Sequence, residues 1–428
     1  MGQGVLTADL LADAGLARED GALRLGGVSL GEIAGEVGTP VYVYNAGVIR
    51  ARYAALDRAL AAVPHRICFA VKANSTLGVL RVLRDAGAGA DIVSGGEMAR
   101  VLAAGFAPDR IVFSGVGKSN AELRAAVRTR LGHLNVESHA ELERLACIVA
   151  EERIHVSVGI RVNPDVTTDT HPYISTGKSG IKFGIPADQV AAAAELVARH
   201  PMLELTTLAM HLGSQLADTL PFRQGIVRLL ELADGLRAAG IDSVRVIDIG
   251  GGLGIRYADE RPIDPDVFAA AVVPLLAPSG HTVYLEPGRF LVGSAGVLLT
   301  EVIYRKHSGG KEFVVVDAGM NDLVRPSHYQ AYHEIVELQS AGRPAERVDV
   351  VGPVCETGDF LALDRELPGL VAGDRLAVLG AGAYGFVMAS NYNSRPRPAE
   401  VIVDRGRWWV ARPRERVDEL FQSERVVP

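Results

Sequence analysis

The chain has 428 residues, of which 48% are hydrophobic and 22% are charged, and its formal net charge is −7. The length indicates two domains, and this balance is typical of a globular protein rather than a disordered or fibrous one. Acidic and basic residues are interleaved, which argues against nucleic acid as the main partner.

No apolar run approaches the roughly 20 residues that a membrane-spanning helix needs, and the first residues lack the basic start of a signal peptide. The three cysteines, Cys68, Cys147 and Cys355, are widely spaced and odd in number. This pattern suits a reducing compartment and has no zinc-ligand spacing. We therefore expect a soluble cytoplasmic protein that binds neither a metal nor a membrane.

Short apolar runs alternate with longer segments of helical periodicity through the first two thirds of the chain. Such alternation predicts parallel βαβ units, and eight apolar runs fit a (β/α)8 TIM-type barrel better than an open sheet. The predicted strands are residues 67–71, 90–93, 111–114, 134–137, 156–162, 207–212, 244–249 and 283–286. The predicted helices are residues 46–62, 97–104, 121–130, 139–151, 188–199, 220–239 and 266–276.

The last third of the chain has a different pattern, in which apolar stretches are separated by Gly, Pro and Asp. This pattern predicts a mostly antiparallel β domain, a barrel or sandwich. Its predicted strands are residues 297–304, 313–317, 348–351, 375–379 and 400–403, and residues 23–25 and 41–44 could pair with them. We place the barrel domain at residues 40–293 and the β domain at residues 1–39 and 294–428.

Polar or glycine residues lie at or just after the carboxyl end of every predicted barrel strand. Because the carboxyl ends of barrel strands meet on the face where active sites form, these residues are expected on one rim. Any one of them could be a simple turn residue, but a lysine, a histidine, a glycine triplet and a glutamate together favour a site. The residues are Lys72, Ser94, Ser114, Gly115, Glu137, Asn163, His211, Gly250, Gly251, Gly252 and Glu286.

Lys72, in FAVKAN, directly follows an apolar strand. Buried surroundings favour the neutral, nucleophilic amine that a Schiff-base lysine requires, although a lysine at a strand end is often only a surface residue. The glycine triplet of IDIGGGLGI lets the backbone approach an anion after the seventh strand, where barrels commonly bind phosphate. Its spacing does not fit the G-x-G-x-x-G pattern of dinucleotide sites.

Glu286 and Arg289 lie close together in LEPGRF. A carboxylate that faces a pyridine nitrogen keeps the nitrogen protonated, and a guanidinium suits a carboxylate or a phosphate. The two could equally form an ordinary ion pair. His211 could stack on an aromatic cofactor or pack as a structural residue, and Cys355, in VGPVCETGDF, could be a reactive thiol on a turn or a buried cysteine.

Taken together, these segments resemble the diaminopimelate decarboxylases, within the alanine-racemase-like and ornithine-decarboxylase-like fold-type III enzymes. The resemblance covers nearly the whole chain, and the motifs are long and occur in the family's order. They are FAVKAN, DIVSGGE, IVFSGVGK, NVES, RVNPDV, THPYISTG, KFGI, HLGSQ, DIGGGLGI, EPGRFLV, DAGMNDLVRP, VGPVCETGDF and MASNYNSRPRPAEV.

The resemblance implies the cofactor and the residues that hold it. Lys72 would carry pyridoxal 5'-phosphate as a Schiff base, His211 would stack on the pyridine ring, and Glu286 would pair with the pyridinium nitrogen. The other expected cofactor-binding residues are Ser214, Gly251, Gly252, Gly288, Arg289 and Tyr384.

The resemblance also implies a substrate site that two chains of a homodimer share. Cys355 would return the proton to the α-carbon of meso-2,6-diaminopimelate, giving L-lysine and CO2, and Cys355 and Glu356 would act across the dimer interface. The expected substrate-binding residues are Arg289, Arg325, Tyr329, Glu356 and Tyr384. Two departures from the family pattern, Ala209 and Thr357, affect no residue that these roles need.

Alternatives stay open at this point. The chain could decarboxylate D-ornithine, D-lysine, carboxynorspermidine or a carrier-bound amino acid, although Arg325 with Tyr329 favours a substrate with a distal carboxylate. An amino-acid racemase would need a tyrosine base in place of the Cys355 motif and usually an arginine in place of Glu286. A non-catalytic relative is disfavoured because Lys72, Glu286 and Cys355 are all present.

The segment THPYISTGKSG contains many small polar residues and glycines. Because such loops are often mobile, we predict that residues 171–180 form a lid near the site.

Overall fold

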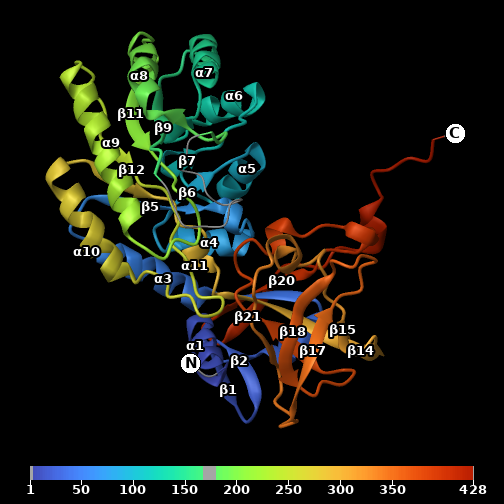
Figure 1. Ribbon diagram of the computed structural model, residues 1–428. Coiled ribbons are helices and arrows are strands. Elements are labelled where there is room, and N and C mark those ends of the chain that lie inside the picture. The colour runs from blue at the N-terminus through green and yellow to red at the C-terminus, as the bar shows by residue number, and fades with distance from the viewer. Residues whose placement is uncertain (1–2, 167–179, 428) are drawn as a thin grey trace. The chain divides into compact units, whose positions relative to one another are not determined.

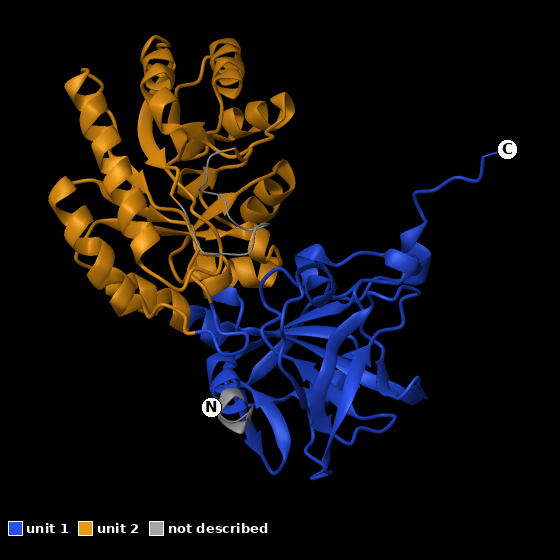
Figure 2. Ribbon diagram, in the orientation of Figure 1, with its two compact units in different colours: residues 1–50, 255–260, 291–428 blue, residues 51–254, 261–290 orange. Residues whose placement is uncertain are grey.

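The computed structural model describes residues 3–166 and 180–427. These residues divide into two compact units (Figure 2). The β unit comprises residues 1–50, 255–260 and 291–428, and the barrel unit comprises residues 51–254 and 261–290. The predicted lid lies, apart from Gly180, outside the described residues.

The barrel unit contains, within the described chain, eight parallel strands that close on themselves, because β8 also pairs with β9 and β13 with β5. Almost all of their residues are buried, so these strands do not show the alternation of apolar and polar residues that is typical of a sheet with one face in water. The predicted (β/α)8 barrel is confirmed. Its strands are β5 (His65–Ala70), β6 (Gly89–Ile92), β7 (Ile111–Phe113), β8 (His133–Val136), β9 (Val156–Asn163), β11 (Leu203–Ala209), β12 (Val246–Asp248) and β13 (Thr282–Leu285), and the short β10 (Ile185–Pro186) adds to β9.

Helices follow the barrel strands and lie on the outside of the barrel (Figure 1). Serine residues begin three of them, where the hydroxyls of Ser94, Ser119 and Ser138 accept backbone N–H groups of the first turn. The helices are α3 (Ala46–Ala59), α4 (Leu77–Asp85), α5 (Gly95–Ala103), α6 (Asn120–Thr129), α7 (His139–Glu152), α8 (Val190–Ala198), α9 (Leu220–Ala238), α10 (Pro265–Leu276) and α11 (Arg289–Val292). The 3-10 turns are η1 (Val71–Ala73), η2 (Pro108–Arg110), η4 (Ala187–Gln189) and η5 (Ala277–Ser279).

The prediction missed α4. This helix buries Val79, Leu80 and Leu83 on one face, as an amphipathic helix does. It has only nine residues, and Gly and Asp near its ends obscured the periodicity. Among the described residues no helix is both long and apolar enough to cross a membrane.

The β unit is built, in the part of the chain that is described, around one large sheet with the strand order β18-β17-β15-β14-β4-β20-β21. Most neighbours are antiparallel, as predicted, whereas β15–β17 and β20–β4 are parallel. Its strands are β4 (Val41–Asn45), β14 (Gly296–Ser308), β15 (Lys311–Val316), β16 (Ile335–Glu337), β17 (Ala345–Val351), β18 (Phe360–Pro368), β19 (Arg375–Val378), β20 (Ala399–Asp404) and β21 (Arg407–Arg412).

The first 45 residues belong to this unit. Strand β4 pairs with β14 and β20, which is the pairing predicted for residues 41–44. The sequence did not indicate the two helices here, α1 (Gln3–Ala14) and α2 (Leu30–Val37). Together with β1 (Leu16–Glu19), β2 (Ala22–Leu25) and β3 (Val28–Ser29), they pack apolar side chains on the sheet. The remaining helical segments are α12 (Arg325–Tyr329), η6 (Phe386–Met388), η7 (Tyr392–Ser394) and η8 (Val417–Leu420).

Candidate active site

Lys72 lies in η1, at the carboxyl end of β5, between the buried residues Val71 and Ala73. Its Nζ atom is 3.3 Å from Oδ2 of Asp91, which lies on the neighbouring strand β6. The Lys72 side chain is 34% exposed, whereas that of Asp91 is 0% exposed. The lysine is therefore held on the barrel rim by a carboxylate that is fully removed from water.

Glu286 follows β13, and its backbone is locked to the glycine triplet. Its N–H donates to the carbonyl of Gly250 over 2.8 Å. A Cβ atom on Gly251 would lie 2.2 Å from the carbonyl oxygen of Glu286, and one on Gly250 would lie 2.3 Å from that of Met210. Glycine is required at both positions because any side chain would collide with backbone.

Two further acids surround the Glu286 carboxyl. Asp248, at the end of β12, and Asp91, on β6, each add a negative charge near it. Burial, followed by these charges, raises the pKa of Glu286 well above its usual range. Burial also raises the pKa of Asp248 to about 6. Ser114, at the end of β7, donates its hydroxyl to Glu286 over 3.4 Å.

His211 lies two residues beyond β11, beside the glycine triplet. Its Nδ1 atom accepts the N–H of Gly251 over 3.2 Å, so this nitrogen carries no proton. Burial, with the positive charges of Lys72 and Arg161, lowers the pKa of the ring well below its usual range. A neutral ring is suited to flat contact with an aromatic ligand.

Arg289 and Ser214 meet in the barrel unit. The Nε and Nη2 atoms of Arg289 donate to the Ser214 hydroxyl over 3.3 and 3.2 Å. Gly288, one residue earlier, approaches the Lys72 turn so closely that an added Cβ would lie 2.9 Å from the Cβ of Ala73. The predicted cofactor residues of the barrel unit therefore come together on the rim of one barrel.

In the β unit, α12 carries the predicted pair Arg325 and Tyr329. Arg325 is 6% exposed; it donates to the Tyr257 hydroxyl over 2.5 Å and stacks on the Tyr257 ring at 4.5 Å. Tyr384, in another loop of this unit, has a left-handed backbone with φ of 56°. Bulky residues rarely adopt this conformation, and such strain often accompanies a functional role.

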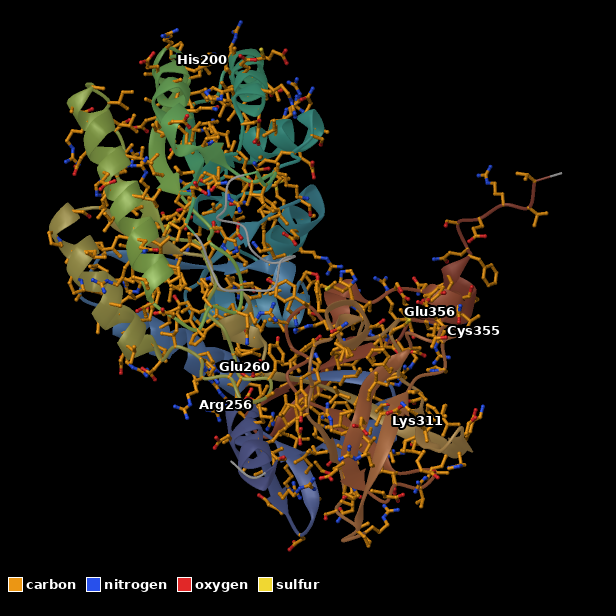
Figure 3. All side chains as sticks on the ribbon, viewed as in Figure 1. His200, Arg256, Glu260, Lys311, Cys355 and Glu356 are labelled. Atoms are coloured by element: carbon orange, nitrogen blue, oxygen red, sulfur yellow. The ribbon has the colours of Figure 1, made fainter. Side chains whose placement is uncertain are left out.

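Cys355 and Glu356 are exposed neighbours on the turn between β17 and β18 (Figure 3). The turn is braced by η7, since the Cys355 N–H donates to Oδ1 of Asn393 over 2.8 Å. A hydrogen bond to Glu356 raises the pKa of Tyr392. The Cys355 turn is therefore exposed but fixed.

Asp359 connects this turn to the segment that leads into α12. Its Oδ1 atom accepts the N–H of Met320 over 2.6 Å, and its Oδ2 atom accepts that of Val354 over 2.5 Å. The turn also approaches α12, because a Cβ on Gly358 would lie 3.3 Å from the Ser327 hydroxyl. The predicted substrate residues Arg325 and Cys355 thus belong to adjoining segments.

The sequence analysis missed Asp91, Asp248 and the supporting residues Tyr257, Asp359 and Asn393. A signal existed for the first two, because each is an acid inside a mostly apolar predicted strand. An acidic residue in a buried strand is rare unless a cation or a hydrogen-bond donor pairs with it. The other three carried no such signal, since the contacts that give them a role, to Met320, Arg325 and Cys355, lie far away in the sequence.

Comparisons with known proteins identify the family of this chain. A family model for the pyridoxal binding domain of pyridoxal-dependent decarboxylases matches residues 46–293. Diaminopimelate decarboxylase from Pseudomonas aeruginosa is 50% identical over 409 residues, which cover 96% of this chain and 98% of the relative. The enzyme from Vibrio cholerae is 46% identical over 412 residues, with coverages of 96% and 98%.

A solved structure of diaminopimelate decarboxylase from Helicobacter pylori, complexed with L-lysine, superposes with a TM-score of 0.89. It is 39% identical and covers 92% of this chain and 98% of its own. These likenesses extend over almost the full length of the chain, and its closed parallel barrel and separate β unit agree with them. The chain therefore belongs to the diaminopimelate decarboxylase family of pyridoxal-dependent decarboxylases.

Proposed function

We propose that this enzyme decarboxylates meso-2,6-diaminopimelate to L-lysine and CO2, the final step of lysine biosynthesis, with pyridoxal 5'-phosphate as its cofactor. The observation that carries the proposal is the grouping of an amine, Lys72, with the buried acid Glu286 and the glycine triplet on one barrel rim. The amino-acid substrate agrees with the lysine bound to the Helicobacter pylori relative.

The barrel residues fit this cofactor. The aldehyde of the cofactor needs an amine, which Lys72 offers. The aromatic ring of the cofactor can stack on the neutral ring of His211. A phosphate needs N–H and hydroxyl donors where no side chain intrudes, which Gly252, Ser214 and the neighbouring Arg289 provide. Gly251, whose N–H donates to His211, would line the phosphate without a side chain of its own. A pyridine nitrogen needs an acid, and Glu286 is buried beside other acids. We assign these residues, with Gly288 and Tyr384, to cofactor binding.

Pyridoxal phosphate, when bound, supplies a conjugated ring that withdraws the electron pair left by the departing carboxylate. Lys72 would attach the cofactor covalently and release it to the substrate amine. Glu286 would hold a proton at the ring nitrogen. His211 would cover one face of the ring and exclude water from it.

We assign the substrate roles to the β unit. Arg325 offers a guanidinium, already oriented by Tyr257, for the distal carboxylate of the substrate, and Tyr329 would add a hydroxyl. Glu356 would accept a hydrogen bond from the distal ammonium of the substrate. Arg289, in the barrel unit, would also contact the substrate. Cys355 would give the proton that replaces the lost carboxylate at the α-carbon, so that one C–C bond breaks and one C–H bond forms.

We further propose that the enzyme is a homodimer in which Cys355 and Glu356 act in the active site of the partner subunit. Their exposure on a braced turn supports this assignment, because a reactive thiol in water is poorly placed for selective protonation. A cytoplasmic location agrees with three cysteines that are all free.

Two substitutions of Lys72 test the function. Lys72→Ala and Lys72→Arg should both abolish L-lysine release from meso-diaminopimelate. Neither should retain the cofactor through borohydride reduction, which fixes it to a lysine for detection by mass spectrometry. Lys72→Arg keeps a positive charge beside Asp91, so it separates loss of chemistry from loss of stability. Lys311→Ala, on the β unit (Figure 3), is the control and should behave as wild type.

Turnover should be fastest with meso-diaminopimelate and much slower with D-lysine or L-ornithine, which lack the distal carboxylate. Lysine release by Lys72→Arg, or a preference for L-ornithine, would contradict the proposal.

A further inference from the structure

Arg325, at the start of α12, is a buried cation with an aromatic partner. The residue is 6% exposed. Its Nη1 atom donates to the Tyr257 hydroxyl over 2.5 Å, and its Cζ atom lies 4.5 Å from the centroid of the Tyr257 ring. Within the part of the chain that the structure describes, no carboxylate forms an ion pair with Arg325. Because a buried cation without an anion is costly in free energy, Arg325 is suited to an anionic group of a ligand.

Three neighbours fix the Tyr257 ring, which is itself buried. The His333 ring meets it edge-on, with 5.4 Å between the ring centroids and 76° between the ring planes. A Cβ atom on Gly380 would lie 3.2 Å from Cδ1 of Tyr257, so the backbone there packs on the ring. Glu260 holds the Tyr257 backbone, because its Oε2 atom accepts the N–H groups of Tyr257 and Ala258 over 3.0 and 2.6 Å (Figure 3). The ring and its hydroxyl are therefore held in one orientation.

His333 is in turn anchored to the sheet of the β unit. It is 0% exposed, and its Nδ1 atom lies 2.8 Å from the carbonyl oxygen of Leu379. A carbonyl can only accept, so Nδ1 carries the proton and donates. The N–H of Leu379 donates to the carbonyl of Glu334 over 2.8 Å, beside the pairing of β16 with β19. Contacts thus run from this strand pair through His333 and Tyr257 to Arg325.

We propose that Tyr257 and His333 are positioning residues that hold the Arg325 guanidinium in one orientation, and so set the preference for ligands with a carboxylate at the end distant from the reacting carbon. The inference rests on the proposed function in one respect, the assignment of Arg325 to that carboxylate. An unrestrained arginine loses much side-chain freedom when it binds an anion, whereas a guanidinium that is already held in place loses less. The positioned arginine therefore raises the affinity for the carboxylate and leaves the bond-breaking step unaffected.

L-lysine and cadaverine are matched probes, because they differ only by the carboxylate that Arg325 would bind. Their dissociation constants with the holoenzyme, measured by isothermal titration calorimetry, involve no turnover. Tyr257→Phe keeps the ring beside the guanidinium and removes only the hydroxyl. We expect this variant to bind L-lysine about tenfold more weakly, as for the loss of one hydrogen bond to a charged group. Its affinity for cadaverine should be unchanged.

His333→Asn tests the second positioning residue. The asparagine amide can replace Nδ1 as the donor to the Leu379 carbonyl, whereas the ring edge that meets Tyr257 is lost. We expect a loss of about threefold in L-lysine affinity, again without an effect on cadaverine. Tyr332→Phe is the matched control, because it removes a hydroxyl from a tyrosine of the same unit on which another arginine, Arg365, stacks at 3.9 Å. It should bind both probes as wild type does.

Steady-state kinetics give a second readout. With meso-diaminopimelate, Tyr257→Phe should raise KM about tenfold and keep kcat, because only the binding of the distal carboxylate is weakened. With D-lysine, which lacks that carboxylate, kcat/KM should be the same as for wild type. A general structural defect would instead lower the turnover of both substrates.

Wild-type affinity of Tyr257→Phe for L-lysine would overturn the proposal, and so would an equal loss for cadaverine. If Tyr257→Phe does not fold, His333→Asn decides by the same two criteria. A wild-type enzyme that bound L-lysine no more tightly than cadaverine would also overturn the proposal. If the wild type released no lysine from meso-diaminopimelate, but Tyr257→Phe selectively lost affinity for L-lysine, the proposed function would fail and the positioning inference would stand.

Discussion

At the residue scale, the charge balance around Lys72 depends on acids that lie on neighbouring strands. Asp91 reaches Lys72 across the β5–β6 pairing, and Asp248, at the end of β12, adds negative charge near Glu286, which follows the neighbouring strand β13. A buried charge without a partner costs several kcal/mol, so such acids persist where a cation or a shared proton offsets them. The charge of each titratable residue on this rim therefore depends on its neighbours.

The proposed proton donor can be tested against a second exposed cysteine of the same chain. Cys355→Ala should lower kcat for lysine formation by about 10²–10⁴-fold, the usual contribution of a general acid. Cys147→Ala, on α7, is the matched control, since both thiols are free and exposed, and it should keep wild-type turnover. Steady-state assays of CO2 and lysine release measure both variants. A Cys355→Ala enzyme with wild-type kcat would rule out this role.

At the element scale, a buried lysine joins three consecutive parts of the barrel. Lys118, in the loop after β7, donates to the carbonyls of Gly115 and Asn135 over 2.9 and 2.7 Å. Its third donor bonds Oε1 of Glu141 on α7 over 2.7 Å, and the two side chains are 1% and 6% exposed. Oε2 of Glu141 in turn accepts the N–H of Glu137, directly after β8.

Removal of one partner of this ion pair should destabilise the barrel unit. Lys118→Met leaves the Glu141 carboxylate buried and uncompensated, so we expect a loss of about 3–5 kcal/mol in the free energy of unfolding. Urea denaturation followed by circular dichroism measures the change. The exposed Lys182→Met serves as control. The double variant Lys118→Met/Glu141→Leu should recover much of the loss, and equal stability of the single variant and wild type would contradict the expectation.

At the scale of the whole molecule, the proposed active-site residues are divided between the two units. Lys72, His211 and Glu286 belong to the barrel unit, and Arg325 and Cys355 belong to the β unit. In the proposed homodimer, each shared site would combine the barrel unit of one chain with the β unit of the other.

Mixed dimers test this sharing. Lys72→Arg and Cys355→Ala chains should each be inactive or nearly so alone. After they are denatured together, mixed in equal amounts and refolded, about a quarter of wild-type activity should return. Half of the dimers would then be mixed, and each mixed dimer would have one intact site out of two. If Cys355 served its own chain, no mixed dimer would have an intact site, and no activity would return.

The sequence by itself determined the alternation of strands and helices that builds the barrel, because local periodicity encodes it. It also placed Lys72, His211, the glycine triplet and Glu286 on one rim, since all barrel strands end on the same face. The long motifs fixed the family. Five helices of the described chain, α1, α2, α4, α11 and α12, were missed, because their periodicity is too brief or too interrupted to stand out.

Only the tertiary structure decided which side chains meet. Asp91 with Lys72, and Asn393 with the Cys355 turn, are pairs separated by about 20 to 40 residues in sequence and joined through strand neighbours or loop packing. The raised pKa of Glu286 likewise follows from burial and nearby negative charge, which are properties of the folded chain and not of any segment.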